Sequence, residues 1–133
     1  MMECVIMGDS IAQGVARFRP TCAQITQQGV NSLTFNNSLI QSVNARYVLI
    51  SLGSNDVGTP DLPRHLAAIR SRIQSREVTW LLSVNNPQAA AQVQQIARAH
   101  GDRVVHVRAV VGPDGVHPST SGYHRLNQMW RPL

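Results

Sequence analysis

The sequence is poor in charge, and lysine is missing altogether. Only 14% of its 133 residues are charged, and the 12 basic residues, all arginines, outnumber 7 acidic ones to give a net charge of +5. Hydrophobic residues make up 43% of the chain, which excludes the low-hydrophobicity composition of a disordered protein. The arginines are scattered, and only Arg70–Arg76 ("RSRIQSR") forms a cluster, which we interpret as a solvated helix face. We therefore expect no nucleic-acid partner.

Long hydrophobic runs are also absent. No run approaches the roughly 20 residues of a membrane-spanning helix, so we expect no membrane partner. The N-terminal segment "MMECVIMGDS" lacks the basic region of a secretory signal, which favours a cytoplasmic location where the protein is made. A chain of this length is sufficient for one compact domain, and we predict a single domain over residues 1–133.

Cysteine is scarce as well. Cys4 and Cys22 follow no metal-binding spacing, and each lies in or beside an apolar segment. We expect two buried free thiols, with a disulfide between neighbouring strands as the alternative. No set of histidine, cysteine and carboxylate residues has the spacing of metal ligands, so we predict neither a metal nor another cofactor.

Five short apolar runs predict the strands of a parallel sheet. They are Cys4–Met7, Thr21–Ile25, Tyr47–Leu52, Val78–Val84 and Arg103–Val110. The third and fourth are almost continuously apolar, which is typical of strands covered on both faces. The helix signals between them are a weak candidate at Leu33–Val43, N-cap and proline pairs at Thr59-Pro60 and Asn86-Pro87, a stop at Gly101 and a last start near Ser121. The pattern predicts an α/β fold, a flavodoxin-like three-layer α/β/α sandwich with about five parallel strands.

Polar residues follow four of these strands. In open parallel sheets ligands bind beyond the carboxyl ends of the strands, so these residues are expected at one rim. They are Gly8-Asp9-Ser10, the segment 27–32 ("QQGVNS"), Gly53-Ser54-Asn55-Asp56 and the segment 112–117 ("GPDGVH"). The other histidines are interpreted as surface residues (His65, His100), a satisfied core residue (His106) and a helix-face residue (His124).

This set of side chains is suited to acyl transfer. Ser10 becomes a nucleophile when an imidazole accepts its proton, and His117 can do so if Asp114 holds the other ring nitrogen. The negative charge that develops on the attacked carbonyl needs fixed donors. Candidates are the Ser10 N–H, a backbone N–H of the turn at Gly29–Ser32 and the side-chain amide of Asn55.

The motifs "GDSIAQG", "QQGVNS", "GSND" and "DGVHP" resemble, in this order, the four sequence blocks of the SGNH (GDSL-type) hydrolases. The resemblance implies a five-stranded parallel sheet between helices and activity as an esterase, lipase or deacetylase without a metal. It implies that Ser10 is the nucleophile, His117 the general base and Asp114 its orienting partner. It also implies that the Ser10 N–H and Asn55 are oxyanion donors.

The second block departs from the family pattern. Many members read "GxSG" there, and the backbone N–H of the second glycine serves the oxyanion. Aligned on Gly29, this sequence has Ser32 at that position. Ser32 is therefore the third expected donor, with Gly29 as the alternative if the register slips, and whether serine weakens the oxyanion hole stays open.

The short chain leaves little room for lids or a lipid tunnel, which argues against a long-chain lipase. We expect a serine esterase that hydrolyses small acyl esters, foremost O-acetyl esters of a carbohydrate or cell-wall polymer. The alternative, favoured by the Ser32 departure and the small size, is a catalytically reduced carbohydrate-binding or virion-associated module. Compact members also occur in phages, and a phage-encoded protein would be located in the host cell or the virion. Arg17, Arg19 and Arg108 are solvated charges or, alternatively, contacts to an anionic substrate. The acyl group, the alcohol and the oligomeric state are undetermined by the sequence.

Overall fold

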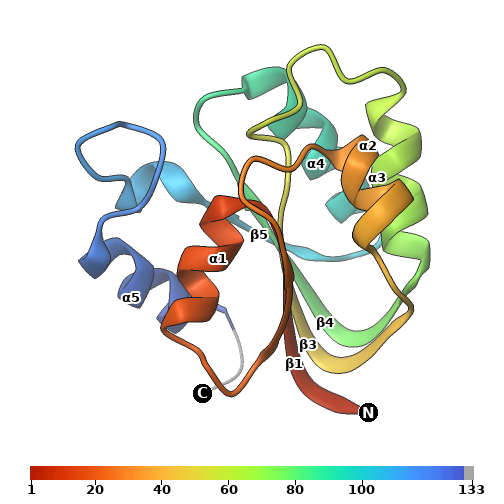
Figure 1. Cartoon of the computed structure of the whole chain (residues 1–133), viewed down its shortest axis with the longest axis horizontal. Helices are drawn as coiled ribbons and strands as arrows, with labels where there is room; N and C mark the ends of the chain where they lie inside the picture. The colour runs from red at the N-terminus through yellow and green to blue at the C-terminus, as the bar shows by residue number, and fades with distance from the viewer. Residues whose placement is uncertain (131–133) are drawn as a thin grey trace.

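The structure is a computed structural model that describes residues 1–130. Its centre is a five-stranded sheet in the order β2-β1-β3-β4-β5, in which every neighbouring pair is parallel (Figure 1). The strands are β1 (Met2–Gly8), β2 (Ala23–Thr26), β3 (Val43–Ser51), β4 (Ile73–Leu82) and β5 (Arg103–His106). The predicted α/β fold with five parallel strands is thus confirmed. The fifth strand is shorter than predicted, because Val107–Val110 forms the 3-10 turn η2.

Helices cover both faces of the sheet. One face carries α1 (Ser10–Arg17) and α5 (Thr120–Met129), and the other carries α2 (Ser32–Thr34), the π-helical turn η1 (Phe35–Leu39), α3 (Leu62–Ser71) and α4 (Pro87–Ala99) (Figure 1). Along β3, Val48 and Ile50 belong to one core and Leu49 to the other. This alternation explains why the central strands are apolar at nearly every position.

The helix starts were predicted with mixed success. The Asn86 side chain accepts the Ala89 N–H at 3.2 Å and Pro87 opens α4, as predicted. Thr59, however, is not a cap, because α3 begins three residues later at Leu62 and the Thr59 hydroxyl donates to Asp56 Oδ1 at 2.9 Å. The weak candidate at 33–43 became α2 and η1, which end at residue 39.

Cys4 and Cys22 form a disulfide, so the expectation of two free thiols was wrong. β2 pairs with β1 so that Ala23 lies opposite Val5, and this register brings the two cysteines together with their Cα atoms 4.9 Å apart. That separation is within the range of disulfides. The bond joins β1 to the residue just before the edge strand β2, and both cysteines pack in the same core cluster as α1.

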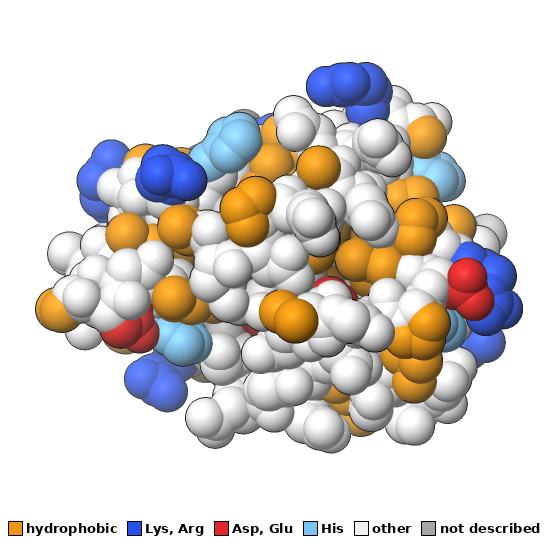
Figure 2. All heavy atoms as spheres, turned by 90° about the horizontal axis from the view of Figure 1, so that it is seen from above, with side chains coloured by type: hydrophobic (Ala, Val, Ile, Leu, Met, Phe, Trp, Pro, Cys, Tyr) orange, Lys and Arg blue, Asp and Glu red, His pale blue; other side chains and the backbone are white. Residues whose placement is uncertain are grey.

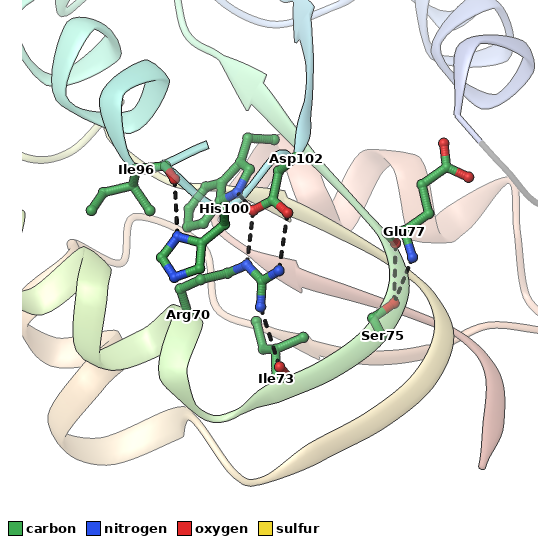
Figure 3. A network of polar contacts seen from close by, with 8 residues as sticks. Arg70, Ile73, Ser75, Glu77, Ile96, His100 and Asp102 are labelled. Carbon is green, nitrogen blue, oxygen red and sulfur yellow. Dashed lines mark hydrogen bonds and ion pairs between the residues drawn. The ribbon is translucent and has the colours of Figure 1, made fainter. Parts of the chain in front are cut away.

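Arg70 is also not part of a solvated cationic face. Its guanidinium donates to both oxygens of Asp102, at 2.8 and 3.0 Å, and Trp80 Nε1 donates to Asp102 Oδ2 at 2.9 Å. The Arg70 and Asp102 side chains are only 13% and 4% exposed. Figure 3 shows this ion pair together with the bond from Arg70 to the Ile73 carbonyl. Arg70, Trp80 and Asp102 thus join α3 to β4 and to the turn before β5.

Two histidines differ from their interpretation. His65 is buried beside Asn36, whose side chain lies at hydrogen-bond distance from His65 Nδ1 (3.1 Å), whereas His106 is exposed at the end of β5.

Within residues 1–130, no helix combines the length and the hydropathy of a membrane span.

Candidate active site

Ser10 stands where β1 turns into α1. Gly8 has φ of +129°, and a Cβ at this position would collide with the Ser51 carbonyl, so the turn requires glycine. Asp9 is the N-cap of α1, and its Oδ1 accepts the Ile11 N–H at 3.0 Å and the Ser51 hydroxyl at 2.9 Å. These contacts fix Ser10 at the first position of the helix, at the carboxyl end of the sheet.

Ser10, His117 and Asp114 form one chain of hydrogen bonds. Ser10 Oγ lies 2.9 Å from His117 Nε2, and His117 Nδ1 lies 2.8 Å from Asp114 Oδ2. Asp114 Oδ1 accepts the backbone N–H groups of Val116 and His117, both at 2.8 Å. Gly115, with φ of +72°, allows the turn that brings the carboxylate back to a histidine only three residues away. The structure therefore joins two motifs 107 residues apart.

The loop that carries Asp114 and His117 is itself closed by backbone hydrogen bonds. The Gly112 N–H donates to the His117 carbonyl at 2.7 Å, and the Gly115 N–H donates to the Gly112 carbonyl at 3.0 Å. Val111 and Pro118 form an antiparallel bridge at its base. These contacts hold the histidine ring over α1 although its side chain is 46% exposed.

The pKa values of the two carboxylates near Ser10 are shifted in opposite directions. The N–H of Val116 and the side chain and N–H of His117 lower the pKa of Asp114 to about 2, so it is ionised at neutral pH. Burial raises the pKa of Asp9 from 3.8 to about 6, against the opposing effect of its bond from Ser51. Asp9 Oδ2 is buried and has no hydrogen-bond partner among the described residues.

Asn55 follows β3 and reaches the same rim. Its Nδ2 donates to the Val30 carbonyl at 3.2 Å, and because a side-chain amide has two hydrogens, one remains free. The Ser10 N–H has no acceptor among the described residues and is a second donor of the kind found at helix starts. Both donors come from loops that follow adjacent strands, β1 and β3.

Ser32 does not fit the expected role of oxyanion donor. Its N–H donates to Asp56 Oδ1 at 2.8 Å, and its hydroxyl donates to Asp56 Oδ2 at 2.7 Å, with both residues buried. An N–H committed to a buried carboxylate has no free hydrogen for a substrate. Gly29, the alternative, lies in an exposed turn with φ of +75°. The Ser32–Asp56 pair was not anticipated, since the two residues are 24 positions apart.

Tyr123 of α5 supports α1 from the side. A Cβ on Gly14 would collide with the Tyr123 ring, so the last glycine of "GDSIAQG" allows α5 to pack closely against the helix of Ser10. Burial raises the pKa of Tyr123, and the charge of Asp9 raises it further. Gly14 and Tyr123 lie near opposite ends of the sequence, so only the structure explains this glycine.

The remaining candidates separate into structural and exposed groups. Arg19 donates to the Asn127 carbonyl at 2.7 Å, whereas Arg17 and Arg108 are exposed. Residues 1–130 contain no group of three or more side chains arranged to hold a metal ion.

A parallel sheet covered on both faces, with a serine after β1 and an Asp–His loop after β5, defines an α/β fold of the SGNH-hydrolase type. Comparison with solved structures agrees. The chain is similar to a candidate lipolytic protein of the G-D-S-L family from Desulfitobacterium hafniense DCB-2, with a TM-score of 0.60 and 13% identity. The similarity covers 96% of this chain and 97% of that one, so the chain has the fold of the SGNH (GDSL-type) hydrolases. No protein-family model and no curated protein matches the sequence.

Proposed function

We propose that this protein is a serine hydrolase that cleaves small acyl esters, foremost O-acetyl esters of a carbohydrate or cell-wall polymer. The observation that carries the proposal is the hydrogen-bond chain from Ser10 through His117 to Asp114. A serine hydroxyl, an imidazole and an ionised carboxylate in this order are the elements of nucleophilic acyl transfer.

In the first step Ser10 Oγ attacks the ester carbonyl while His117 Nε2 takes the hydroxyl proton. Asp114 accepts the Nδ1–H bond, which keeps the Nε2 lone pair directed at Ser10 and stabilises the imidazolium that forms. The tetrahedral intermediate then expels the alcohol, to which His117 returns the proton. Water, activated by the same imidazole, attacks the acyl-enzyme, and the carboxylic acid leaves with Ser10 restored.

The oxyanion is assigned two donors, the Ser10 N–H and the free amide hydrogen of Asn55. The first lies at the start of α1, where the aligned peptide dipoles favour negative charge. Ser32 is not included because its N–H is bound to Asp56.

The openness of the site supports a small acyl group on a large alcohol. The side chains of His117 and Asp114 are 46% and 55% exposed. Burial of a long acyl chain requires an enclosed apolar channel, whereas an exposed site admits a polymer.

The test is hydrolysis of p-nitrophenyl acetate, butyrate and octanoate by the wild type, Ser10→Ala and Ser38→Ala. Ser38 is an exposed serine on η1 and serves as the matched control. We expect cleavage of acetate above octanoate, a loss of several orders of magnitude in Ser10→Ala, and no change in Ser38→Ala. A fluorophosphonate should label the peptide that contains Ser10. Equal turnover by the wild type and Ser10→Ala would contradict the proposal.

One observation favours a second candidate, a module that binds an acylated glycan with reduced turnover. With the Ser32 N–H engaged, the loop after β2 contributes no assigned oxyanion donor. For this candidate we expect an acetylated polysaccharide to bind the wild type and Ser10→Ala equally, with no acetate released by either. Measured acetate release separates the two functions.

A further inference from the structure

A cavity of about 210 Å³ opens at the carboxyl ends of β4 and β5, beside α4. Its apolar wall comes from both the strand end and the helix, and two basic side chains also line it. The lining residues that matter here are Leu82, Val84, Pro87, Ala90, His106 and Arg108. Pockets for drug-sized ligands measure about 300–1,000 Å³, so this smaller cavity is suited to a group the size of one ring.

The charge of the cavity is of one sign. Arg108 and His106 line the cavity and are exposed, and no acidic residue lines it. Five of the seven acidic side chains pair with other basic groups, and the remaining two, Asp9 and Asp56, are buried. Among the described residues Arg108 has no ion-pair or side-chain hydrogen-bond partner. A free guanidinium presents a planar fork of donors that matches a carboxylate.

The cavity is next to the oxyanion side of the proposed active site. Asn85 directly follows Val84, which lines the cavity. Asn85 also forms two hydrogen bonds with Ser54, the residue before Asn55 in the sequence. The Ser54 hydroxyl donates to Asn85 Oδ1 at 2.8 Å, and Asn85 Nδ2 donates to the Ser54 carbonyl at 3.0 Å. Figure 2 looks onto this end of the molecule and shows arginine and histidine side chains beside apolar ones on the same face.

We propose that this cavity binds a carboxylate on the alcohol part of the ester, and that Arg108 is a specificity-determining residue for acidic sugars. The inference rests on the proposed function, since it names the substrate class of the same enzyme. A sugar acid matches the cavity in two ways: the C–H face of its ring packs against the Val84, Pro87 and Ala90 side chains, and its carboxylate meets the Arg108 guanidinium. The acetyl group on a neighbouring unit then extends past Ser54 and Asn85 toward Ser10.

The test uses a matched pair of substrates, disaccharides that carry one acetyl group at the same position. In one the neighbouring unit is glucuronic acid and in the other it is glucose, so they differ only by carboxylate against hydroxymethyl. We expect the wild type to prefer the acid by about tenfold in kcat/KM, the lower end for a charged hydrogen bond because Arg108 is exposed. Arg108→Gln should lower the ratio to about one and leave kcat/KM for the neutral sugar unchanged. Added salt should reduce the preference of the wild type.

The matched control is Arg76→Gln, which removes the same charge from an exposed arginine at the other end of β4. It should retain the full preference for the acid. Equal cleavage of both sugars by the wild type, cleavage of p-nitrophenyl acetate but of neither sugar, or an unchanged ratio in Arg108→Gln overturns the inference and leaves the esterase proposal intact.

If no ester at all is cleaved, the proposed function fails and the cavity is tested by binding alone. Glucuronate and inorganic phosphate are titrated into the wild type and Arg108→Gln, with chemical shifts of the Ala90 and Val84 methyl groups as the readout. Shifts by glucuronate that Arg108→Gln abolishes support the site. No shifts, or shifts by phosphate only, overturn it.

Discussion

The backbone N–H of Ser32 donates to Asp56 Oδ1, and the Ser32 hydroxyl donates to Asp56 Oδ2, so one serine satisfies both oxygens of one buried carboxylate. This pair connects the loop after β2 to the loop after β3 across the intervening strand β1. Because Asp56 directly follows Asn55, the pair also fixes the backbone that carries a proposed oxyanion donor.

Ser32→Ala should therefore destabilise the protein more than it impairs catalysis. The substitution leaves Asp56 Oδ2 without its donor, which costs about 1–3 kcal/mol in the free energy of unfolding. Urea denaturation measures the loss, with Ser38→Ala as the exposed control. Acetate hydrolysis below the transition should stay well above that of Asn55→Ala. An unchanged midpoint would show that the hydroxyl bond to Asp56 contributes nothing to stability.

Asn55→Ala should lower kcat by on the order of 10²–10³-fold, the usual loss for one oxyanion donor. Asn55→Asp should be at least as slow, because it places a negative charge beside the developing oxyanion. Thermal unfolding verifies that both variants fold. Full activity in either variant removes Asn55 from the oxyanion hole.

Asp114→Asn separates the orienting role of the carboxylate from its role in the loop. The asparagine carbonyl still accepts the N–H groups of Val116 and His117, whereas its NH₂ faces Nδ1 and favours the wrong tautomer of His117. We expect kcat to fall on the order of 10³-fold with little change in the unfolding midpoint. Because the pKa of Asp114 is about 2, its ionised form is complete above about pH 4. Any loss of wild-type activity above that pH then has another origin.

The free energy of unfolding should fall as the pH rises from 4 to 6, because Asp9 loses its proton over this range. Its pKa is about 6 in the folded chain, against an ordinary value of 3.8 that applies to the unfolded chain. The native state therefore binds the proton more tightly than the unfolded state. The associated stability is fully present below about pH 4 and is lost as the pH passes through 6, by up to about 3 kcal/mol. Asp9→Asn retains an acceptor for Ile11 and Ser51 and should flatten this dependence. Denaturation of both proteins at pH 4, 5, 6 and 7 is the measurement; parallel curves contradict the expectation.

The Cys4–Cys22 disulfide should stabilise the chain. It closes a loop with a sequence separation of 18, and cross-links of this size contribute about 3 kcal/mol. Air-oxidised protein should show no reactive thiol, and reduction should lower the unfolding midpoint. Cys4→Ala/Cys22→Ala should match the reduced wild type and be insensitive to reductant. Two titratable thiols in non-reduced, denatured protein would mean that the bond does not form.

Much of the fold could be predicted because its signals are local. Continuous apolar runs predicted strands buried on both faces, and Asn86-Pro87 marked the start of α4, since each depends on residues a few positions apart. The proposed triad residues were also identified from short motifs, because a parallel sheet brings all of its strand ends to one rim.

The predictions that were wrong concern pairs distant in sequence. Thr59 is a residue type that commonly caps helices and it precedes a proline, but its hydroxyl donates to Asp56 instead. Arg70 was assigned to a solvated face because Asp102, its partner, lies 32 residues away. No local pattern distinguishes a free arginine from one whose carboxylate arrives on another element.

The sequence by itself indicated most of the element types and the parallel sheet, and it nominated Ser10, Asp114 and His117 as the proposed triad, because periodicity and turn chemistry operate over a few residues. Only the tertiary structure decided which side chains became neighbours. The order β2-β1-β3-β4-β5 placed Cys22 beside Cys4, gave the Ser32 N–H to Asp56, and put Arg108 in the lining of a cavity without an ion-pair partner among the described residues. Those outcomes depend on which strands lie side by side and in what register, and such long-range pairing is set by the packing of the whole core.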